Sequence, residues 1–239
     1  MHGLHNEALS PGGKKMWCIP ALTPEFIERM EDILALYAQP YNSQEPVLCF
    51  DEKSKQLLQD MRIPLPMRSR FLLRRDYEYK RNGTRNIFLA VEPKAGFRTA
   101  SVTKRRTKTD FAREIERMIA LPRYRNAHMI HIVLDNLNTH FEASLTQTFG
   151  TKKARNMMRR IWFHYTPKHA SWLNMAEIEL SVMGRQCLNR RIPTHTTLAR
   201  EVAAWEQYRN DAKATIKWRF TITDARKVFK EYYIAKLVE

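Results

Sequence analysis

The chain has 239 residues, 44% of them hydrophobic, which is enough to bury the core of one large domain. Lysine and arginine number 41 against 25 acidic residues, and the formal net charge of +16 favours a polyanionic partner, most simply nucleic acid. The chain has no membrane-length apolar run, no signal-peptide core at its start and no Cys-x-x-Cys pair among its three cysteines, so we expect a cytosolic protein without a thiolate zinc site.

The beginning of the chain is predicted to be a tail followed by a helix. Residues 1–22 contain proline and glycine in clusters, which is typical of a tail or linker. Thr23 is a suitable N-cap and Pro24 suits the first helical position. The apolar stripe of that helix comprises Phe26, Met30, Ile33 and Tyr37.

A group of strands is predicted next. The apolar run at 47–50 predicts a first strand that stops at Asp51. Asn82-Gly83 lies between two strand-like runs and is typical of a two-residue hairpin turn, so we expect antiparallel strands on either side of it. The segment 97–102 is predicted to add another antiparallel strand, and a helix is expected to start at Thr107 or Thr109.

A short apolar run rich in β-branched residues, 130–134, predicts a strand that is buried on both faces and stops at Asp135. Taken alone, Asp135 suits an ordinary turn as well as it suits a catalytic carboxylate. A right-handed crossover through the preceding helix would make this strand parallel to the first one. Asp51 and Asp135 would then lie side by side, an arrangement that makes chemical sense if a divalent cation bridges the two carboxylates.

The later chain offers a third acid. A short helix over 141–149 and a strand over 161–165 precede a helix that starts near Met175, and two further helices follow. Glu177 lies in the first turn of the Met175 helix, beside the apolar stripe of Ala176, Leu180 and Met183. This order of elements predicts an α/β ribonuclease-H-like fold, a mixed five-stranded sheet flanked by helices, in which the first and fourth strands are neighbours.

Three segments, 50–54, 134–140 and 165–177, resemble the catalytic domain of bacterial insertion-sequence transposases. The resemblance is to the six-thirty family of the DDE superfamily, which is allied to the mariner elements. It runs from about Lys14 to near the C-terminus. Its most specific parts are Asp-Asn at 135–136 and Leu-Asn-x-x-Glu at 173–177.

The resemblance implies a catalytic site, a cofactor and partners. Asp51, Asp135 and Glu177 would be the acidic triad that binds two divalent ions, Mg²⁺ or Mn²⁺, for cleavage of a transposon end and its transfer to target DNA. The partners would be DNA and a second copy of the chain in a synaptic complex, in the bacterial cytoplasm at the nucleoid. Relatives carry an N-terminal helix-turn-helix region, whereas residues 1–22 are predicted to be only a tail here and 23–239 would be the catalytic domain with its C-terminal helices.

Six residues are candidate DNA contacts, and each has an alternative interpretation as a solvated charge or a locally hydrogen-bonded group. They are Arg105, Arg106, Asn136, His140, Lys168 and His169.

Glu177 and Glu179 are separated by about 200° around the helix axis, so one helix cannot aim both at a single ion. We therefore predict that Glu177 is the third metal ligand and that Glu179 lies nearer solvent as an ordinary surface acid. Two alternative functions stay open: a non-catalytic DNA-binding or dimerisation fragment that regulates a longer enzyme, and a nuclease that cuts without joining. The three intact acids favour an enzyme.

Overall fold

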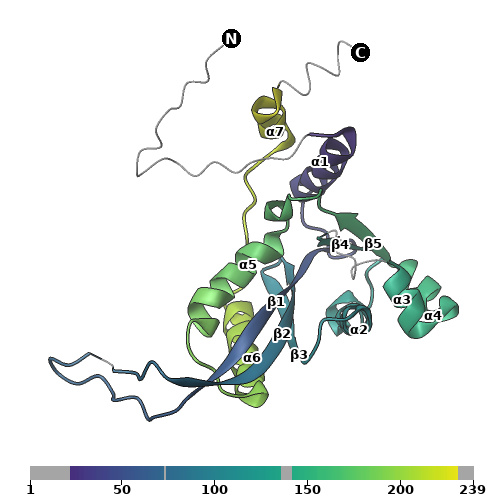
Figure 1. Cartoon of the computed structure of the whole chain (residues 1–239). Helices are drawn as coiled ribbons and strands as arrows, with labels where there is room; N and C mark the ends of the chain where they lie inside the picture. Colours follow the sequence, from purple (N-terminus) through teal and green to yellow (C-terminus); the bar gives the residue numbers. More distant parts are fainter. Residues whose placement is uncertain (1–21, 73, 136–141, 231–239) are drawn as a thin grey trace, which may run out of the picture.

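The computed structural model describes residues 22–72, 74–135 and 142–230, and its centre is one five-stranded sheet (Figure 1). The strands are β1 Val47–Asp60, β2 Tyr79–Glu92, β3 Phe97–Thr103, β4 Ile130–Leu134 and β5 Ile161–Tyr165. Their order in the sheet is β3-β2-β1-β4-β5, with antiparallel pairing among β1, β2 and β3 and parallel pairing among β1, β4 and β5. The predicted mixed sheet with its first and fourth strands adjacent is therefore confirmed.

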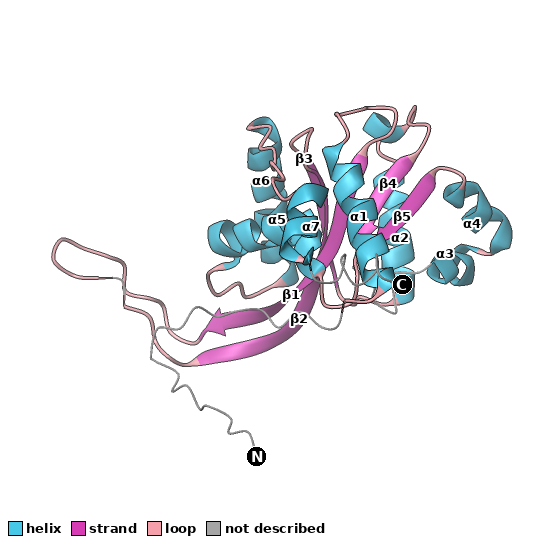
Figure 2. Cartoon of the chain, turned by 90° about the horizontal axis from the view of Figure 1, so that it is seen from above, coloured by secondary structure: helices cyan, strands magenta, loops and turns pink. Residues whose placement is uncertain are grey.

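Helices cover both faces of this sheet (Figure 2). The helices and helical turns are α1 Pro24–Ala38, α2 Lys108–Ile119, η1 Pro122–Tyr124, α3 Glu142–Phe149, α4 Thr151–Met158, η2 Ser171–Leu173, α5 Met175–Met183, η3 Gly184–Leu188, α6 His195–Asp211 and α7 Ile222–Val228. Side chains alternate along β1, so Leu48 and Phe50 pack with α2, α3 and α4, while Cys49 lies on the opposite face with α1, α5 and α7. Among the described helices, none combines the length and the apolar character that a bilayer crossing requires.

Local sequence explains where the helices begin. Thr23 accepts a hydrogen bond from the Phe26 backbone N–H at 3.1 Å, and Pro24 occupies the first turn of α1, as predicted. The apolar stripe predicted for this helix is buried. Thr107, one of the two predicted starts, caps α2 through a reciprocal capping box with Asp110.

The first strand does not stop at Asp51, and that prediction was wrong. Only 47–49 of β1 pair with β4, whereas β1 continues to Asp60 in antiparallel register with β2. The apolar run at 47–50 marks the part of the strand that is covered on both faces. Beyond Asp51 the strand forms a ribbon with β2 that includes many exposed polar residues, so no apolar run signals its end.

Asn82-Gly83 is not a hairpin turn, which is a second correction. The pair lies inside β2, where the register shifts: Gln56 is opposite Thr84, but Leu58 is opposite Arg81. Gly83 has a φ of +84°, the left-handed conformation that glycine tolerates. The positive φ that suits Asn-Gly to a turn is used here for a bulge instead.

The true connection between β1 and β2 is the segment 61–78, which we call the arm. Leu65 bridges to Arg74 and Arg68 bridges to Phe71, so the arm folds back on itself. It extends away from the helices (Figure 1 and Figure 2). Its exposed large apolar side chains are Met61, Ile63, Leu65, Met67, Phe71, Leu72 and Tyr77.

Candidate metal and active site

The register of the parallel strands brings Asp51 and Asp135 together. Cys49 of β1 is the partner of Val133 of β4, and each acid follows two residues later. Because side chains alternate, both carboxylates project from the face that carries α1 and α5. The predicted adjacency therefore follows from strand pairing, even though β1 continues past its acid.

Asn174 caps α5, the helix that carries the third acid, and bonds it to β1. Its side-chain oxygen accepts a hydrogen bond from the Ala176 backbone N–H at 3.1 Å and so caps α5. Its side-chain nitrogen donates to the Phe50 carbonyl at 2.9 Å, directly before Asp51 in the chain. Because Asn174 is fully buried, the first turn of α5, which contains Glu177, is held against β1.

The three acids form one cluster. A carboxylate oxygen from each of Asp51, Asp135 and Glu177 lies within 4.8 Å of the other two. Such a group of hard oxygen donors suits Mg²⁺ or Mn²⁺ rather than a metal that prefers nitrogen or sulfur.

Burial, together with electrostatic repulsion within this cluster, raises the pKa of two of its acids. Asp51 is 5% exposed, and burial raises its pKa to about 8, with further contributions from the charges of Asp135 and Glu177. A hydrogen bond from the Glu52 backbone N–H at 2.7 Å opposes that rise. Burial and the charge of Asp135 also raise the pKa of Glu177, while Lys53 lowers it. A bound divalent cation would remove the repulsion, so the donor set fits a metal ion.

Two pairs of candidate DNA contacts lie exposed in connections near the site. Lys168 and His169 form the turn between β5 and η2, where His169 adopts a left-handed backbone with a φ of 62°. Arg105 and Arg106 lie between β3 and α2. The Arg106 guanidinium is 3.5 Å from the Glu52 carboxylate, so this basic connection lies beside the residue that follows Asp51.

The two other candidate contacts, Asn136 and His140, lie outside the described residues.

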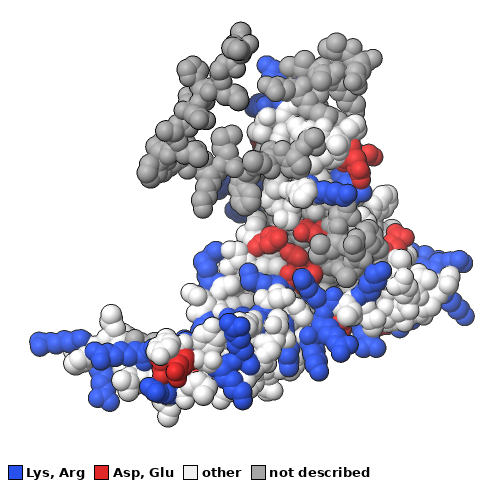
Figure 3. All heavy atoms as spheres, viewed as in Figure 1, with Lys and Arg blue, Asp and Glu red and all other residues white. Residues whose placement is uncertain are grey.

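The surface around the site is mostly basic. On the face drawn in Figure 3, a central group of acidic side chains lies at the upper edge of a broad area of lysine and arginine side chains, which continues onto the arm. The arm itself carries Arg62, Arg68, Arg70, Arg74 and Arg75. This distribution suits a polyanion that crosses the acidic cluster.

The expected position of Glu179 was wrong. Glu177 is exposed, whereas Glu179 is fully buried and forms ion pairs with Arg98 and Arg209. The two acids do lie on different sides of α5, as the helical geometry requires. On its side of α5, Glu179 contacts Arg98 of β3 and Arg209 of α6, and the positions of those two elements cannot be read from the helix itself.

Sequence reasoning assigned no role to three residues that contact or influence the acids. Asn174 directly precedes a helix, and this N-cap pattern is a recognisable signal. Lys53 lies two positions after Asp51 in β1, so its side chain lies on the same face of the strand. The two-residue period of a strand could therefore have identified it. Thr166 donates a hydrogen bond to Asp135 at 3.3 Å, and nothing in the local sequence marks that role.

Comparison with known proteins adds a family and a fold. Residues 46–199, more than half of the chain, match the family model described as DDE superfamily endonuclease. No curated protein matches the chain.

Several solved structures are similar at low sequence identity. A Mos1 transposase paired-end complex with a left transposon end has a TM-score of 0.54 at 14% identity, covering 86% of this chain and 61% of that one. A pre-cleavage Mos1 transpososome has a TM-score of 0.53 at 10% identity, with coverages of 86% and 66%. A Mos1 mariner paired-end complex with Mn has a TM-score of 0.52 at 13% identity, with coverages of 86% and 62%. The predicted ribonuclease-H-like α/β fold is thus confirmed, and the chain spans less than two thirds of these relatives.

Proposed function

The chain belongs to the DDE superfamily endonucleases, and from that premise we propose that it is the catalytic part of a DNA transposase. The single observation that carries this proposal is the cluster of Asp51, Asp135 and Glu177. Mutually repelling carboxylates at the edge of a basic surface suit metal-dependent chemistry on a phosphodiester. We propose further that the chain derives from a bacterial insertion sequence of the six-thirty family and acts in the cytoplasm at the nucleoid.

The proposed reaction has two steps at one site. In cleavage, a water oxygen bonds to phosphorus, the bond from phosphorus to the 3′-oxygen breaks, and the leaving oxygen takes up a proton as a 3′-hydroxyl. In transfer, that hydroxyl attacks a target phosphodiester, so one ester bond forms as another breaks. Two Mg²⁺ or Mn²⁺ ions held by the acidic cluster would activate the attacking oxygen and stabilise the leaving oxygen.

The residues of the chain have separate roles in this proposal. Asp51, Asp135 and Glu177 hold the ions, and the hydrogen bonds from the Glu52 backbone and from Thr166 orient two of the three carboxylates. The remaining proposed role is contact with DNA phosphates on either side of the acids. It falls to Arg105, Arg106, Lys168 and His169, together with Asn136 and His140.

Cleavage and joining of labelled duplex DNA test the function. With Mn²⁺ present we expect nicked and joined products from the chain, and neither from Asp135→Ala. The matched control is Asp211→Ala, because Asp211 is an exposed acid at the end of α6 whose side chain pairs with Gln207. Nicks without joined products would support the nuclease alternative. Binding without any metal-dependent nick would support the non-catalytic regulator.

DNA binding itself is expected to be unspecific and sensitive to salt. The net charge of +16 implies the release of several counterions on binding, and phosphate contacts carry no sequence information. Titration of several unrelated duplexes at different salt concentrations measures both properties. Tight, salt-insensitive binding to one sequence would contradict this expectation.

We also propose that the chain works as a homodimer on DNA, and the arm supports this partner. On the arm, Ile63 is 92% exposed and Leu72 is 82% exposed. Exposed apolar side chains that gather on a projecting segment favour a protein–protein interface. Sedimentation of the protein–DNA complex tests the proposal: Ile63→Asp should yield a monomer on DNA. Ser69→Asp is the control, because it adds the same charge to the arm without removing an apolar side chain. If Ile63→Asp dimerised on DNA as fully as the unmodified chain, a role for the arm in dimerisation would be contradicted.

A further inference from the structure

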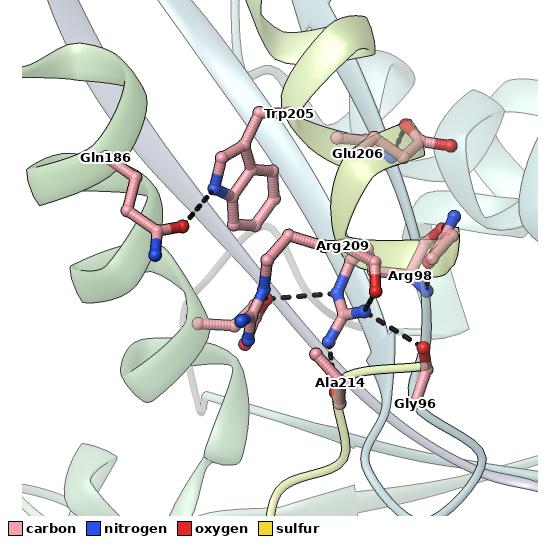
Figure 4. A network of polar contacts seen from close by, with 10 residues as sticks. Gly96, Arg98, Gln186, Trp205, Glu206, Arg209 and Ala214 are labelled. Atoms are coloured by element: carbon pink, nitrogen blue, oxygen red, sulfur yellow. Dashed lines mark hydrogen bonds and ion pairs between the residues drawn. The ribbon is translucent and has the colours of Figure 1, made fainter. Parts of the chain in front are cut away.

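Glu179 is the centre of a buried ionic cluster that joins α5, β3 and α6. Figure 4 shows two members of this cluster, Arg98 and Arg209. Arg209 of α6 donates two hydrogen bonds to the Glu179 carboxylate, at 2.9 and 3.1 Å. The Arg98 guanidinium of β3 lies 3.0 Å from the same carboxylate. The side chains of Arg98 and Glu179 are fully buried, so both charges are removed from water.

Arg98 is itself immobilised by backbone groups. Its guanidinium donates to the carbonyls of Gly96 and Arg209, each at 2.9 Å, and to the Ala214 carbonyl at 2.6 Å. Its backbone N–H and carbonyl both pair with the Asn210 side chain, at 2.8 and 2.9 Å. The Arg98 guanidinium is therefore enclosed by one rigid frame, which consists of β3, the end of α6 and the segment that follows α6.

Close approach of two backbone segments reinforces this frame. Gly96 has a φ of +65°, and a Cβ atom there would lie 2.5 Å from the backbone carbonyl of Lys213. No larger residue fits without a backbone shift, so the β2–β3 turn and the segment after α6 are held in contact.

The same helix carries a proposed metal ligand two positions away. Glu177 and Glu179 point about 200° apart around α5, so a fixed direction for one carboxylate fixes the direction of the other. Apolar contacts alone are non-directional and permit small rotations of a helix, whereas a two-point arginine–carboxylate pair is directional. Buried ion pairs add little stability beyond what well-packed apolar residues supply, so orientation is the property that this cluster contributes.

We propose that Glu179, held by Arg98 and Arg209, is a positioning residue that sets the rotation of α5 and so aims Glu177 at Asp51 and Asp135. This inference rests on the proposed function, because it assumes that Glu177 binds a divalent cation. Asn174 fixes the start of the helix against β1, and Glu179 fixes its rotation against β3 and α6. The third ligand is thereby set from two separate parts of the fold.

Mn²⁺ binding by the full chain, followed through the spectroscopic signal of the free ion, tests the proposal. Outer partners of metal sites change affinity by about 10-fold or more when they are lost, so we expect Glu179→Gln to weaken Mn²⁺ binding by about 10-fold. The number of ions bound per chain should stay unchanged. Arg209→Lys keeps the charge but loses the two-point contact, and it should weaken binding in the same direction by less.

Glu114→Gln is the matched control. Glu114 is a buried acid of α2 that pairs with Arg117 at 2.7 Å, on the opposite face of the sheet. Its replacement should lower the melting temperature without changing Mn²⁺ affinity. A purely structural role for Glu179 gives a different pattern, in which fewer chains bind Mn²⁺ but the folded ones bind it as tightly as the unmodified chain.

The outcomes separate the inference from the proposed function. If the unmodified chain binds no Mn²⁺, or if Glu177→Gln binds it equally well, the proposed site is wrong and this inference falls with it. If Glu177→Gln weakens binding while Glu179→Gln and Arg209→Lys bind like the unmodified chain, only the inference is overturned. Should Glu179→Gln not fold, the Arg209→Lys result decides the matter.

Discussion

Helix α5 carries two glutamates in opposite electrostatic surroundings. Glu177 lies with Asp51 and Asp135 in a cluster of acids, where burial and the neighbouring negative charges raise the pKa of Asp51 to about 8. Glu179, two positions later, lies fully buried between the guanidiniums of Arg98 and Arg209.

The contrast distinguishes a candidate binding site from a structural contact. A cluster of like charges destabilises the folded protein unless a ligand of opposite charge compensates, whereas opposite charges in contact already satisfy each other. Burial alone would have selected Glu179 as the more unusual acid. The sign of the neighbouring charges is the better guide, and it selects Glu177.

Removal of a charge from the acidic cluster should produce the largest effect. Asp51→Asn keeps the size of the side chain, and its oxygen can still accept the hydrogen bond from the Glu52 backbone. We expect metal-dependent nicking to fall below detection, because a ligand is lost, while the metal-free melting temperature does not fall, because repulsion is relieved. Saturating Mn²⁺ at about 100 times its dissociation constant should stabilise the unmodified chain by about 2.7 kcal/mol and Asp51→Asn much less. Unchanged nicking by Asp51→Asn would exclude Asp51 as a ligand.

Loss of the charge of Glu179, the acid paired with two arginines, should destabilise the fold. Glu179→Gln leaves Arg98 buried without its charge partner, and the free energy of unfolding should fall by about 3 to 5 kcal/mol in urea titrations. Glu177→Gln should leave that free energy unchanged or raise it when no metal is present. If Glu177→Gln were the more destabilising of the two, the contrast between the clusters would be wrong.

The pH dependence of stability should distinguish the acidic cluster further. The pKa of Asp51 in the native state is about 8, above its ordinary value of about 3.9, so the native state retains a proton that the unfolded chain releases. This contribution to the metal-free stability is present at low pH and is lost as pH rises from about 4 to about 8. Thermal melts should therefore show a flatter pH dependence for Asp51→Asn than for the unmodified chain. Parallel curves would contradict the raised pKa.

The smallest expected effect concerns the basic surface near the acidic cluster. Lys168→Ala should weaken binding to all duplexes alike and reduce the salt slope of DNA binding by about 1, as loss of one phosphate contact does. Lys227, an exposed lysine of α7, provides the control. An equal change in slope for both variants would mean that Lys168 acts only through net charge.

Much of the architecture is determined by the sequence alone, because its signals are local. Capping residues such as Thr23 and Thr107 mark where helices begin, and the apolar stretch at 130–134 marks the most deeply buried strand. Acids directly after apolar runs, combined with right-handed crossover, predict that Asp51 and Asp135 are neighbours. Helical periodicity also separates Glu177 from Glu179.

Only the tertiary structure decided the features that depend on distant partners. β1 continues past Asp51 because β2 supplies its hydrogen bonds, and Asn82-Gly83 forms a bulge because the strands remain paired on both sides of it. Glu179 is buried because Arg98 of β3 and Arg209 of α6 contact it, and both arginines are distant from α5 in the sequence. A charged residue can be buried only where an opposite charge is brought to it, and that depends on how the whole chain packs.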